Sequence, residues 1–592
     1  MKATIKRPGL PGAAVLAMAT ASYMAGAHAV NFNIGEVEGQ LDSALSVGAS
    51  WAVRAPDPDF IAQGNGGQGD SRTSDDARLN FKKGETFSKI FKGIHDLELK
   101  YSDSGVFLRG KYWYDFELKD ESRDLYDIRD DNRKRGAQSS GVELLDAFVY
   151  HNYELGDLPG SARVGKQVVS WGGSTFISGG INSINPLDAN ALRRPGSELK
   201  EGLLPVNMIY LQQALAEAVS VEAFYQLEWD QTVADNCGTF FASSDIVADG
   251  CDDRYVVRGM DIEPGQSDNS GLNGNTIYLP RGGDRDARDS GQFGVALRWF
   301  VPELNDTEIS AYYLNYHSRT PVGSSEISTA PNPFAAPGFG AANAKYFLEY
   351  PEDIRLYGLS FNTTFGTASV EGELSYRPNM PLAIDDLTYA TLRLAPVVPS
   401  VIPNSGVPGD EIHGYTRVPM TQGQTSITQT FDQILGASRL SLLGEVGFTH
   451  LNGINEGDYG EYRFGRASHF GPGEYFDENG NDLCRTLLSG RPEYCNNKGF
   501  FTRNAWGYRL RAGLTYPVVI GGLDLSPSLA WSHDVDGNSP TFTEGSKAVS
   551  LGLSAKYLNN YEASISYTDY FGGDYTTNGD RDFVSASFGV TF

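Results

Sequence analysis

The segment from Trp506 to Tyr516 alternates strictly between two kinds of side chain. Its even positions are aromatic at both ends and aliphatic or small between them, whereas its odd positions include Arg509 and Arg511. A period of two indicates a β-strand, and about 10 residues with an aromatic at each end match a tilted strand that crosses a bilayer. Because lipid does not tolerate arginine, the odd face has to line an interior. The segment therefore predicts one strand of a transmembrane β-barrel.

The C-terminal end of the chain repeats this pattern. Over the last eleven residues, apolar side chains at every second position alternate with Ser, Gly and Thr, and the final apolar residue is Phe592. A chain that stops in an aromatic strand resembles outer-membrane barrels, whose assembly machinery reads such a strand. We therefore predict that Phe592 is an assembly signal and that the barrel assembly machinery is a partner.

Segments with the same period recur along the chain, and we expect eighteen of them to be strands. They are 37–53, 94–101, 106–118, 142–153, 161–170, 206–214, 219–229, 290–301, 307–317, 353–365, 368–377, 425–437, 439–451, 503–516, 523–533, 545–557, 561–570 and 582–592. The predicted fold is all-β, a transmembrane antiparallel barrel of about 18 strands, with roughly 16 to 20 as the range.

The connections between these segments alternate in length. Short turns, such as 102–105 and 558–560, alternate along the chain with long polar segments, such as 230–289 and 452–502. In outer-membrane barrels the short turns are periplasmic and the long loops are extracellular. A soluble β-sandwich or propeller is the alternative, but neither needs Arg or Glu in mid-strand opposite an aromatic face.

Residues 1–29 have the parts of a secretory signal peptide. Three basic residues precede a small and apolar stretch, and Ala27-His28-Ala29 fits the small-x-small cleavage rule. We expect cleavage after Ala29, which leaves 30–592 as one barrel domain. A membrane-anchoring helix is the competing interpretation, but the stretch is short and weakly apolar, and no later run reaches roughly 20 apolar residues. The expected location is the outer membrane of a Gram-negative bacterium.

The composition favours strands and excludes one class of partner. Gly occurs 68 times, and Tyr and Phe occur 31 times each, which suits pleated, half-buried surfaces. The formal net charge of −26 makes nucleic acid an unsuitable partner. Acidic loops fit a surface bathed in divalent cations and lipopolysaccharide, so lipopolysaccharide and outer-membrane lipid are expected partners; a solvated acidic face is the plainer alternative.

The four cysteines form two close pairs in polar segments, Cys237 with Cys251 and Cys484 with Cys495. An even count in an exported chain predicts two local disulfides. Metal binding is the competing interpretation, but neither pair has CxxC spacing or a nearby His. We predict neither a metal site nor a cofactor.

The connection at 171–205 differs from the other long segments. It is rich in Gly, less acidic than the other loops and more apolar, with Phe176, Ile181 and Leu203 among its apolar residues. A loop that carries its own apolar residues packs against a surface. In a barrel the available surface is the interior wall, so we predict that 171–205 folds into the lumen.

This part of the sequence resembles a known family. The similarity lies in several runs: Ser170-Trp-Gly-Gly-Ser174, Gly180-Ile-Asn-Ser-Ile-Asn-Pro-Leu-Asp188, Arg194-Pro-Gly-Ser-Glu-Leu-Lys-Glu201, Leu204-Pro-Val206 and Tyr225-Gln-Leu-Glu-Trp229. They are similar to the proteobacterial outer-membrane barrel family catalogued as domain of unknown function 1302. One position departs, because Gly173 stands where an acidic residue is expected in relatives.

The resemblance implies a barrel over the whole mature chain, and little about activity. Such barrels are often encoded near a periplasmic carrier protein of the lipoprotein-carrier type and an inner-membrane exporter of the lipid-transporting type. The resemblance therefore implies traffic in hydrophobic or amphipathic compounds, with these two proteins as partners.

Strand parity places ten charged side chains on the lumen wall. They are Arg109, Lys111, Glu222, Glu228, Arg298, Glu371, Glu373, Glu445, Arg509 and Arg511. A porin for small ions would cluster one sign at its constriction, whereas mixed signs suit ion pairs that hold an infolded loop, or passage of a zwitterionic or amphipathic solute. Mutual pairing that only fills a polar wall is the plainer interpretation.

We predict a constriction loop from six residues of the infolded segment. They are Trp171, Arg193, Arg194, Glu198, Lys200 and Glu201. The basic members are expected to pair with inward carboxylates such as Glu222, Glu371 and Glu373. The alternative is an exposed loop in which Arg-Pro-Gly is a turn signal.

Three classes of function remain, and the first is favoured. A channel or transporter for hydrophobic or amphipathic small molecules fits the predicted lumen. A surface receptor or adhesin built from the long loops needs no permeation. An outer-membrane hydrolase is disfavoured, because none of the seven histidines after residue 29 lies in a GxSxG or HExxH setting, so we predict no catalytic residues.

The acidic run 477–482 lacks the full calcium loop with its terminal Glu, so solvation of acidic side chains explains this run better than calcium binding.

Overall fold

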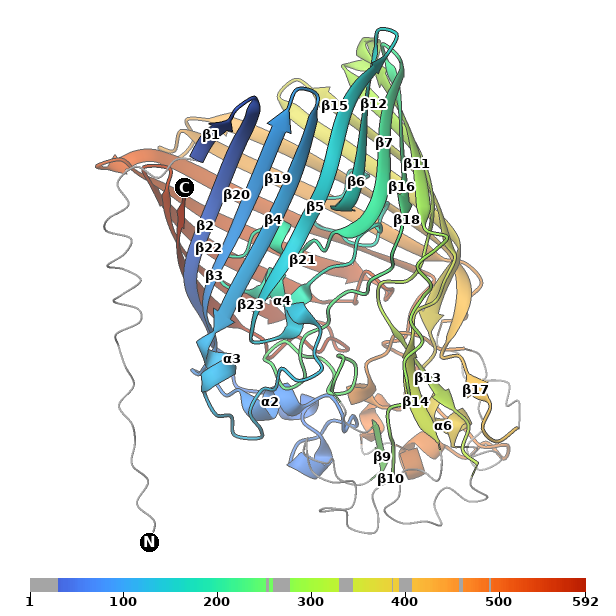
Figure 1. Ribbon diagram of the computed structural model, residues 1–592. Helices are drawn as coiled ribbons and strands as arrows, with labels where there is room; N and C mark the ends of the chain where they lie inside the picture. Colours follow the sequence, from blue (N-terminus) through green and yellow to red (C-terminus); the bar gives the residue numbers. More distant parts are fainter. Residues whose placement is uncertain are drawn as a thin grey trace.

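The computed structural model describes residues 30–251, 255–258, 277–329, 344–385, 387–392, 407–456, 462–488 and 491–592 (Figure 1). The predicted signal peptide, 1–29, lies outside these residues. Among the described residues, no helix is both long enough and apolar enough to cross a membrane.

Eighteen antiparallel strands form one closed barrel, which confirms the predicted fold class. They are β2 (Val37–Ala52), β3 (Thr86–Tyr101), β4 (Ser104–Asp115), β5 (Ser140–Leu155), β6 (Leu158–Gln167), β7 (Val206–Ala216), β8 (Val219–Gln226), β11 (Phe293–Val301), β12 (Thr307–Tyr316), β15 (Ile354–Phe365), β16 (Ala368–Ala383), β18 (Tyr415–Asp432), β19 (Arg439–Leu451), β20 (Asn504–Ile520), β21 (Leu523–Asp536), β22 (Lys547–Tyr557), β23 (Tyr561–Phe571) and β24 (Phe583–Thr591).

The first and last barrel strands close the sheet. Residues Ala44–Ala52 of β2 pair with β24, and Ser43 exchanges two backbone hydrogen bonds with Phe592, at 2.7 and 2.8 Å. A short additional strand, β1 (Val30–Ile34), pairs with the start of β2 and was not predicted. Closure leaves no unpaired strand edge around the barrel, which is the arrangement that a bilayer requires.

The predicted alternation of connections holds. Short turns join the strands at the barrel end where β1 and the C-terminus lie, and the long connections gather at the opposite end (Figure 1). Every one of the eighteen predicted segments overlaps a barrel strand. Three strands begin or end well beyond the predicted bounds, namely β3, β16 and β18.

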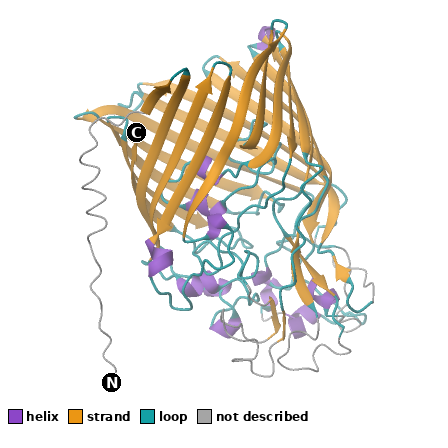
Figure 2. Cartoon of the chain, viewed as in Figure 1, coloured by secondary structure: helices purple, strands orange, loops and turns teal. Residues whose placement is uncertain are grey.

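The long connections build a folded layer at that end, which we call the outer layer (Figure 2). It contains two small sheets, β9 (Tyr255–Arg258) with β10 (Ile277–Leu279), and β13 (Val322–Glu326) with β14 (Lys345–Glu349) and β17 (Glu411–Ile412). Both predicted disulfides are present there, Cys237–Cys251 and Cys484–Cys495.

The helices of the structure are short. The α-helices are α2 (Asp76–Asn80), α3 (Phe116–Asp120), α4 (Ala189–Arg193), α5 (Leu199–Gly202) and α6 (Leu387–Thr391). The 3-10 turns are Pro58–Phe60, Gln63–Asn65, Arg135–Ala137, Pro302–Leu304, Ser468–Phe470 and Pro492–Tyr494, and a π turn spans Cys484–Leu488. The helix α4 lies inside the barrel (Figure 1).

Alternation along the strands separates the two faces of the wall. Leu529, Leu551 and Ile565 are exposed on the outside at 45%, 54% and 52%, as expected for a surface that meets lipid. Their sequence neighbours point inward and are all Ser, Ala or Gly. The period of two in the sequence therefore determines which side chains face the lumen.

Candidate functional site

The connection between β6 and β7, residues 168–205, lies inside the barrel, as predicted for 171–205. Its first part contacts β16, β18 and β19, and its second part contacts β3 and β4. At its far end, a Cβ added to Gly48 of β2 would lie 2.6 Å from the Pro195 side chain. We call residues 168–205 the lumen segment.

Two wall carboxylates hold the first part of the lumen segment through its backbone. Glu445 of β19 accepts hydrogen bonds from the N–H groups of Thr175, Phe176 and Ile177 at 3.0, 2.6 and 2.9 Å. Glu373 of β16 accepts from two further N–H groups of the segment, those of residues 173 and 181, at 2.8 and 2.9 Å. A carboxylate can accept several such bonds, and charge strengthens each of them.

Trp171 anchors the start of the segment to the neighbouring wall. Its indole N–H donates to Glu222 of β8 at 2.7 Å, and its ring packs against Phe224 and Tyr312. The ring is 2% exposed and belongs to the largest apolar cluster of the barrel interior. A buried Trp needs a partner for its N–H, and Glu222 supplies one.

Wall donors satisfy carbonyl groups of the same part. Arg377 of β16 donates to the Gly180 carbonyl at 2.6 Å and to the Ser183 hydroxyl at 3.0 Å. Gln226 donates to the Ile184 carbonyl at 3.0 Å, and Arg319 donates to the same oxygen at 3.1 Å. Because both backbone donors and acceptors find wall partners, this irregular stretch can stay buried without a ladder of its own.

The second part of the lumen segment is a closed excursion from Asp188 to Gly202. Leu187 and Leu203 form an antiparallel bridge, and the N–H of Asp188 donates to the Gly202 carbonyl at 2.8 Å. The Asp188 side chain caps α4 through the Ala191 N–H at 3.0 Å. The two ends of the excursion therefore meet at its base.

Two buried lysines of the wall fasten this excursion. Lys111 of β4 lies 3.0 Å from the Asp188 carboxylate and donates to the Glu201 carbonyl at 2.9 Å. Lys92 of β3 lies 2.6 Å from the Glu201 carboxylate and donates to the Gly196 carbonyl at 2.8 Å. The segment therefore presents carboxylates to lysines of the wall, which is the reverse of the predicted polarity.

The predicted partners were wrong for Arg193 and Arg194, whereas Lys200 lies beside an inward carboxylate of the wall, Asp96 of β3, although not one of those predicted. Arg193 pairs with Asp235 of the outer layer, and Lys200 lies 3.7 Å from Asp96 and 3.3 Å from Glu198. Arg194 donates to the Gly136 carbonyl at 2.9 Å and lies over the ring of Trp113 at 4.4 Å. None of the three reaches Glu222, Glu371 or Glu373, because backbone amides, Trp171 and Arg298 already occupy two of those carboxylates.

Most of the predicted wall residues point into the lumen. Arg109 pairs with Asp96 and Asp146, Arg298 with Glu222 and Glu308, and Arg509 with Asp534. Glu371 lies beside Gly173 of the lumen segment. Arg511 is exposed on the same face of β20 as Arg509 and makes no hydrogen bond or ion pair with any described residue.

Glu228 is an exception to the predicted lumen set. It lies two residues beyond the end of β8, and its carboxylate accepts from the backbone N–H and the side-chain amide of Asn207 at 3.0 and 2.8 Å. Asn207 alternates with the buried Val206 and Met208, so it faces away from the lumen. Glu228 is thus a rim residue.

The sequence prediction missed several residues of the site, among them Arg377, Asp188 and Lys92. Arg377 shares a face with Glu371 and Glu373 by parity, so the signal for it was present. Asp188 precedes a short helix, and Asp is a preferred N-cap residue. Lys92 fell outside the predicted strand, because β3 begins at Thr86 and not near residue 94.

The lumen segment leaves one sector of the wall only partly covered. Inward positions of β8 to β19 that meet the segment, such as Phe224, Gln422 and Glu445, are buried. On β21 to β24 the inward positions are small, hydroxyl-bearing and only half-buried: Ser528, Ser550, Ser554, Ser564, Ser566, Ser585 and Ser587. A Cβ on Gly513 of β20 would meet nothing within 4 Å. We call this sector the serine wall.

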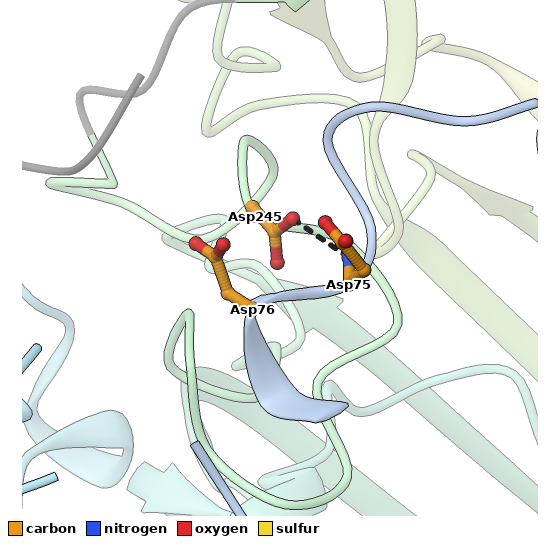
Figure 3. A group of neighbouring side chains, drawn as sticks. All are labelled: Asp75, Asp76 and Asp245. Atoms are coloured by element: carbon orange, nitrogen blue, oxygen red, sulfur yellow. Dashed lines mark hydrogen bonds between the residues drawn. The ribbon is translucent and has the colours of Figure 1, made fainter. Parts of the chain in front are cut away.

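A cluster of three buried aspartates lies in the outer layer (Figure 3). Asp75, Asp76 and Asp245 each have one oxygen within 4.8 Å of the other two. Asp245 accepts from the Asp75 N–H at 3.0 Å, and Tyr126 donates to Asp76 at 2.8 Å. Burial raises the pKa of the Asp75 carboxyl, so a proton there relieves repulsion. Through these hydrogen bonds the cluster joins three of the connections between barrel strands.

Comparison with solved structures finds outer-membrane proteins of low identity. OccAB1 of Acinetobacter baumannii is 11% identical, with 95% of this chain and 98% of that chain covered and a TM-score of 0.40. OccD3 (OpdP) of Pseudomonas aeruginosa is 8% identical, with 95% and 93% covered and a TM-score of 0.37. The outer membrane channel DcaP of A. baumannii is 10% identical, with 95% and 100% covered and a TM-score of 0.35.

A search of curated proteins finds no match to this sequence. The family model described as "Protein of unknown function (DUF1302)" matches residues 10–592, nearly the whole chain. This agrees with the resemblance carried by the runs between Ser170 and Trp229. The chain therefore belongs to the DUF1302 family.

Proposed function

We propose that the protein is an outer-membrane channel in which the lumen segment narrows the passage. The observation that carries this proposal is the contrast between the two sides of the lumen. The segment is bound to the wall from β3 to β19, whereas the serine wall stays half-exposed beside it. A receptor or adhesin without transport would need no half-exposed polar sector along the barrel interior.

The solutes that we propose are hydrophobic or amphipathic small molecules. Most lumen charges near the segment are paired, as with Arg298 and Glu222 or Arg109 and Asp96, so no single-sign ring controls the passage. Neutral hydroxyl groups line the half-exposed side. This lining favours solutes with both polar and apolar surface over bare ions.

We also propose that the chain resides in the outer membrane, in contact with its lipid and lipopolysaccharide, after insertion by the barrel assembly machinery. A periplasmic carrier protein and an inner-membrane exporter of the lipid-transporting type would supply or remove the solute. No enzymatic step is part of this proposal.

Reconstitution tests the channel. The purified full-length protein in planar bilayers should give discrete conductance steps in KCl, and liposomes that contain it should swell in amphipathic solutes faster than protein-free liposomes. Folded protein that gives neither conductance nor uptake would support the receptor. Hydrolysis of lipid esters by the detergent-solubilised barrel would instead favour an enzyme.

A further inference from the structure

A cavity of about 400 Å³ lies where the lumen segment meets β23, β24 and the outer layer. Twelve residues line it, and three of them are Arg193, Arg194 and Arg581, whereas none is Asp or Glu. This is unexpected in a chain with 74 acidic and 48 basic residues. We call this space the arginine cavity.

The three guanidinium groups differ in how far a carboxylate balances their charge. Arg193 is neutralised by Asp235. Arg194 has no carboxylate at ion-pair distance among the described residues, and it contacts the Gly136 carbonyl and the Trp113 ring. An anion that enters the cavity would therefore meet a free positive charge at Arg194.

Arg581 is the second such group, and it is deeply buried. It is 4% exposed, and its Nη2 atom has no hydrogen-bond partner in the described part of the chain. Its nearest carboxylate, Asp580, lies 3.6 Å from Nε and is already bound in two places by Arg78, at 2.8 and 3.1 Å. No described residue accepts a hydrogen bond from this guanidinium, which lines the cavity, so a ligand oxygen within its reach would be favourable.

Burial and the neighbouring Arg78 lower the pKa of Arg581 to about 9. The group therefore remains charged at neutral pH. Burial also limits the screening of this charge by water and salt.

The remaining lining matches the rest of an amphipathic anion. Phe241 and Phe583 provide apolar surface, and Tyr570, Ser566 and Ser585 provide hydroxyl groups. Ligand sites of a few hundred Å³ combine apolar walls with a few placed polar groups in this way. Ser566 and Ser585 also belong to the serine wall, so the cavity and the proposed path share two wall residues.

We propose that the arginine cavity binds an organic carboxylate with an apolar body, through Arg194 and Arg581, before the solute passes the lumen segment. This inference rests on the proposed channel, and it narrows the solute class to amphipathic anions. A neutral or cationic compound of the same shape would bring no negative charge to the guanidinium groups of Arg194 and Arg581.

The experiment measures binding to the detergent-solubilised full-length protein by titration calorimetry. The probe is 4-phenylbutanoate, compared with 4-phenylbutan-1-ol and 4-phenylbutylammonium. We expect saturable binding of the carboxylate, and binding of the alcohol and the ammonium roughly tenfold weaker or worse, since a charged hydrogen bond is worth about 1.5–3 kcal/mol. Equal binding of the three compounds, or no binding of the carboxylate, would overturn the proposal.

Variants locate the site. Arg194→Gln and Arg581→Gln should each weaken carboxylate binding roughly tenfold, and Ser585→Phe should abolish it by filling the cavity. Arg485→Gln is the matched control, because Arg485 is exposed in the outer layer and, among the described residues, pairs with Asp482. Undiminished binding in Arg194→Gln and Ser585→Phe would refute the site, even if Arg581→Gln failed to fold.

The same preparations separate this inference from the proposed channel. KCl conductance without binding of 4-phenylbutanoate would contradict the proposed site and still support the proposed channel. If the protein shows no conductance but binds the carboxylate in a way that depends on Arg194, the proposed site is supported and the proposed channel is contradicted.

Discussion

Lys111 and Asp188 form a buried ion pair, with 3.0 Å between Nζ and Oδ2, that joins the barrel wall to the helix inside it. Both side chains are at most 2% exposed. Removal of one partner leaves a buried charge without compensation, which costs about 3–5 kcal/mol. The pair therefore holds the excursion 188–202 in place.

Lys111→Met should release that excursion. We expect faster hydrogen exchange of the backbone amides in 188–202, by about two orders of magnitude or more for the stated cost, with the barrel strands unchanged. Lys119→Met is the control, because Lys119 is 39% exposed and pairs with Asp130 at the surface. Exchange in 188–202 equal to that of the wild type would show that the ion pair does not hold the excursion.

Glu445→Ala should loosen the other end of the lumen segment. The substitution removes the acceptor for three N–H groups, those of Thr175, Phe176 and Ile177. Each amide that stays buried without an acceptor destabilises the folded state by about 1–3 kcal/mol. Hydrogen exchange of 173–179 should rise, whereas Glu371→Ala, which removes an inward carboxylate without these bonds, should leave it near the wild-type rate. The reverse ranking of the two variants would contradict this account.

The disulfides report the orientation of the barrel. All four cysteines are at most 4% exposed and lie in the outer layer. If this layer is extracellular, a membrane-impermeant thiol label should modify them on whole cells after reduction, and not before. Labelling that requires a broken outer membrane would reverse the topology.

Acid should weaken part of the outer layer through His469. Burial, and then the charge of Arg78, lower the pKa of His469 to about 4, whereas an unfolded His titrates near 6.5. The unfolded state thus binds a proton that the native state excludes. The stabilisation is complete above about pH 6.5 and is lost as the pH falls toward about 4, by roughly 3 kcal/mol in all.

The measurement is the ratio of proteolysis rates of the outer layer at about pH 5 and about pH 7. His469→Phe keeps the ring contacts with Phe60 and cannot titrate, so its ratio should be smaller than that of the wild type. The comparison of the two proteins also removes the opposite contribution of Asp75, whose pKa is raised. An identical ratio in both proteins would exclude His469 as the source.

Strand count and wall polarity were predictable because a barrel wall imposes a period of two on the sequence. The same rule failed for the start of β18, where Tyr415–Gln424 extends the strand. There the outward positions include Arg417, Thr421 and Gly423 where a lipid-facing strand would have aliphatic residues, so the pattern of such a strand is lost. The criterion detects the apolar band and not the full hydrogen-bonded strand.

The pairing inside the lumen was not predictable from the sequence. The apolar residues of 171–205 indicated that the segment packs inside, which the structure confirms. The ion pairs depend on the path of the segment through the barrel. Arg193, for example, pairs with Asp235, a residue 42 positions later in another connection. Periodicity carries no information on contacts between irregular segments.

The most direct test of the constriction is the single-channel conductance of a variant that lacks 189–201. Because Asp188 and Gly202 are joined by a hydrogen bond of 2.8 Å, a short Gly linker can close the gap without strain on β6 or β7. The account predicts a larger conductance than that of the wild type in planar bilayers, with equal amounts of folded barrel. Conductance at the wild-type value in the correctly folded variant would show that the lumen segment does not limit the passage.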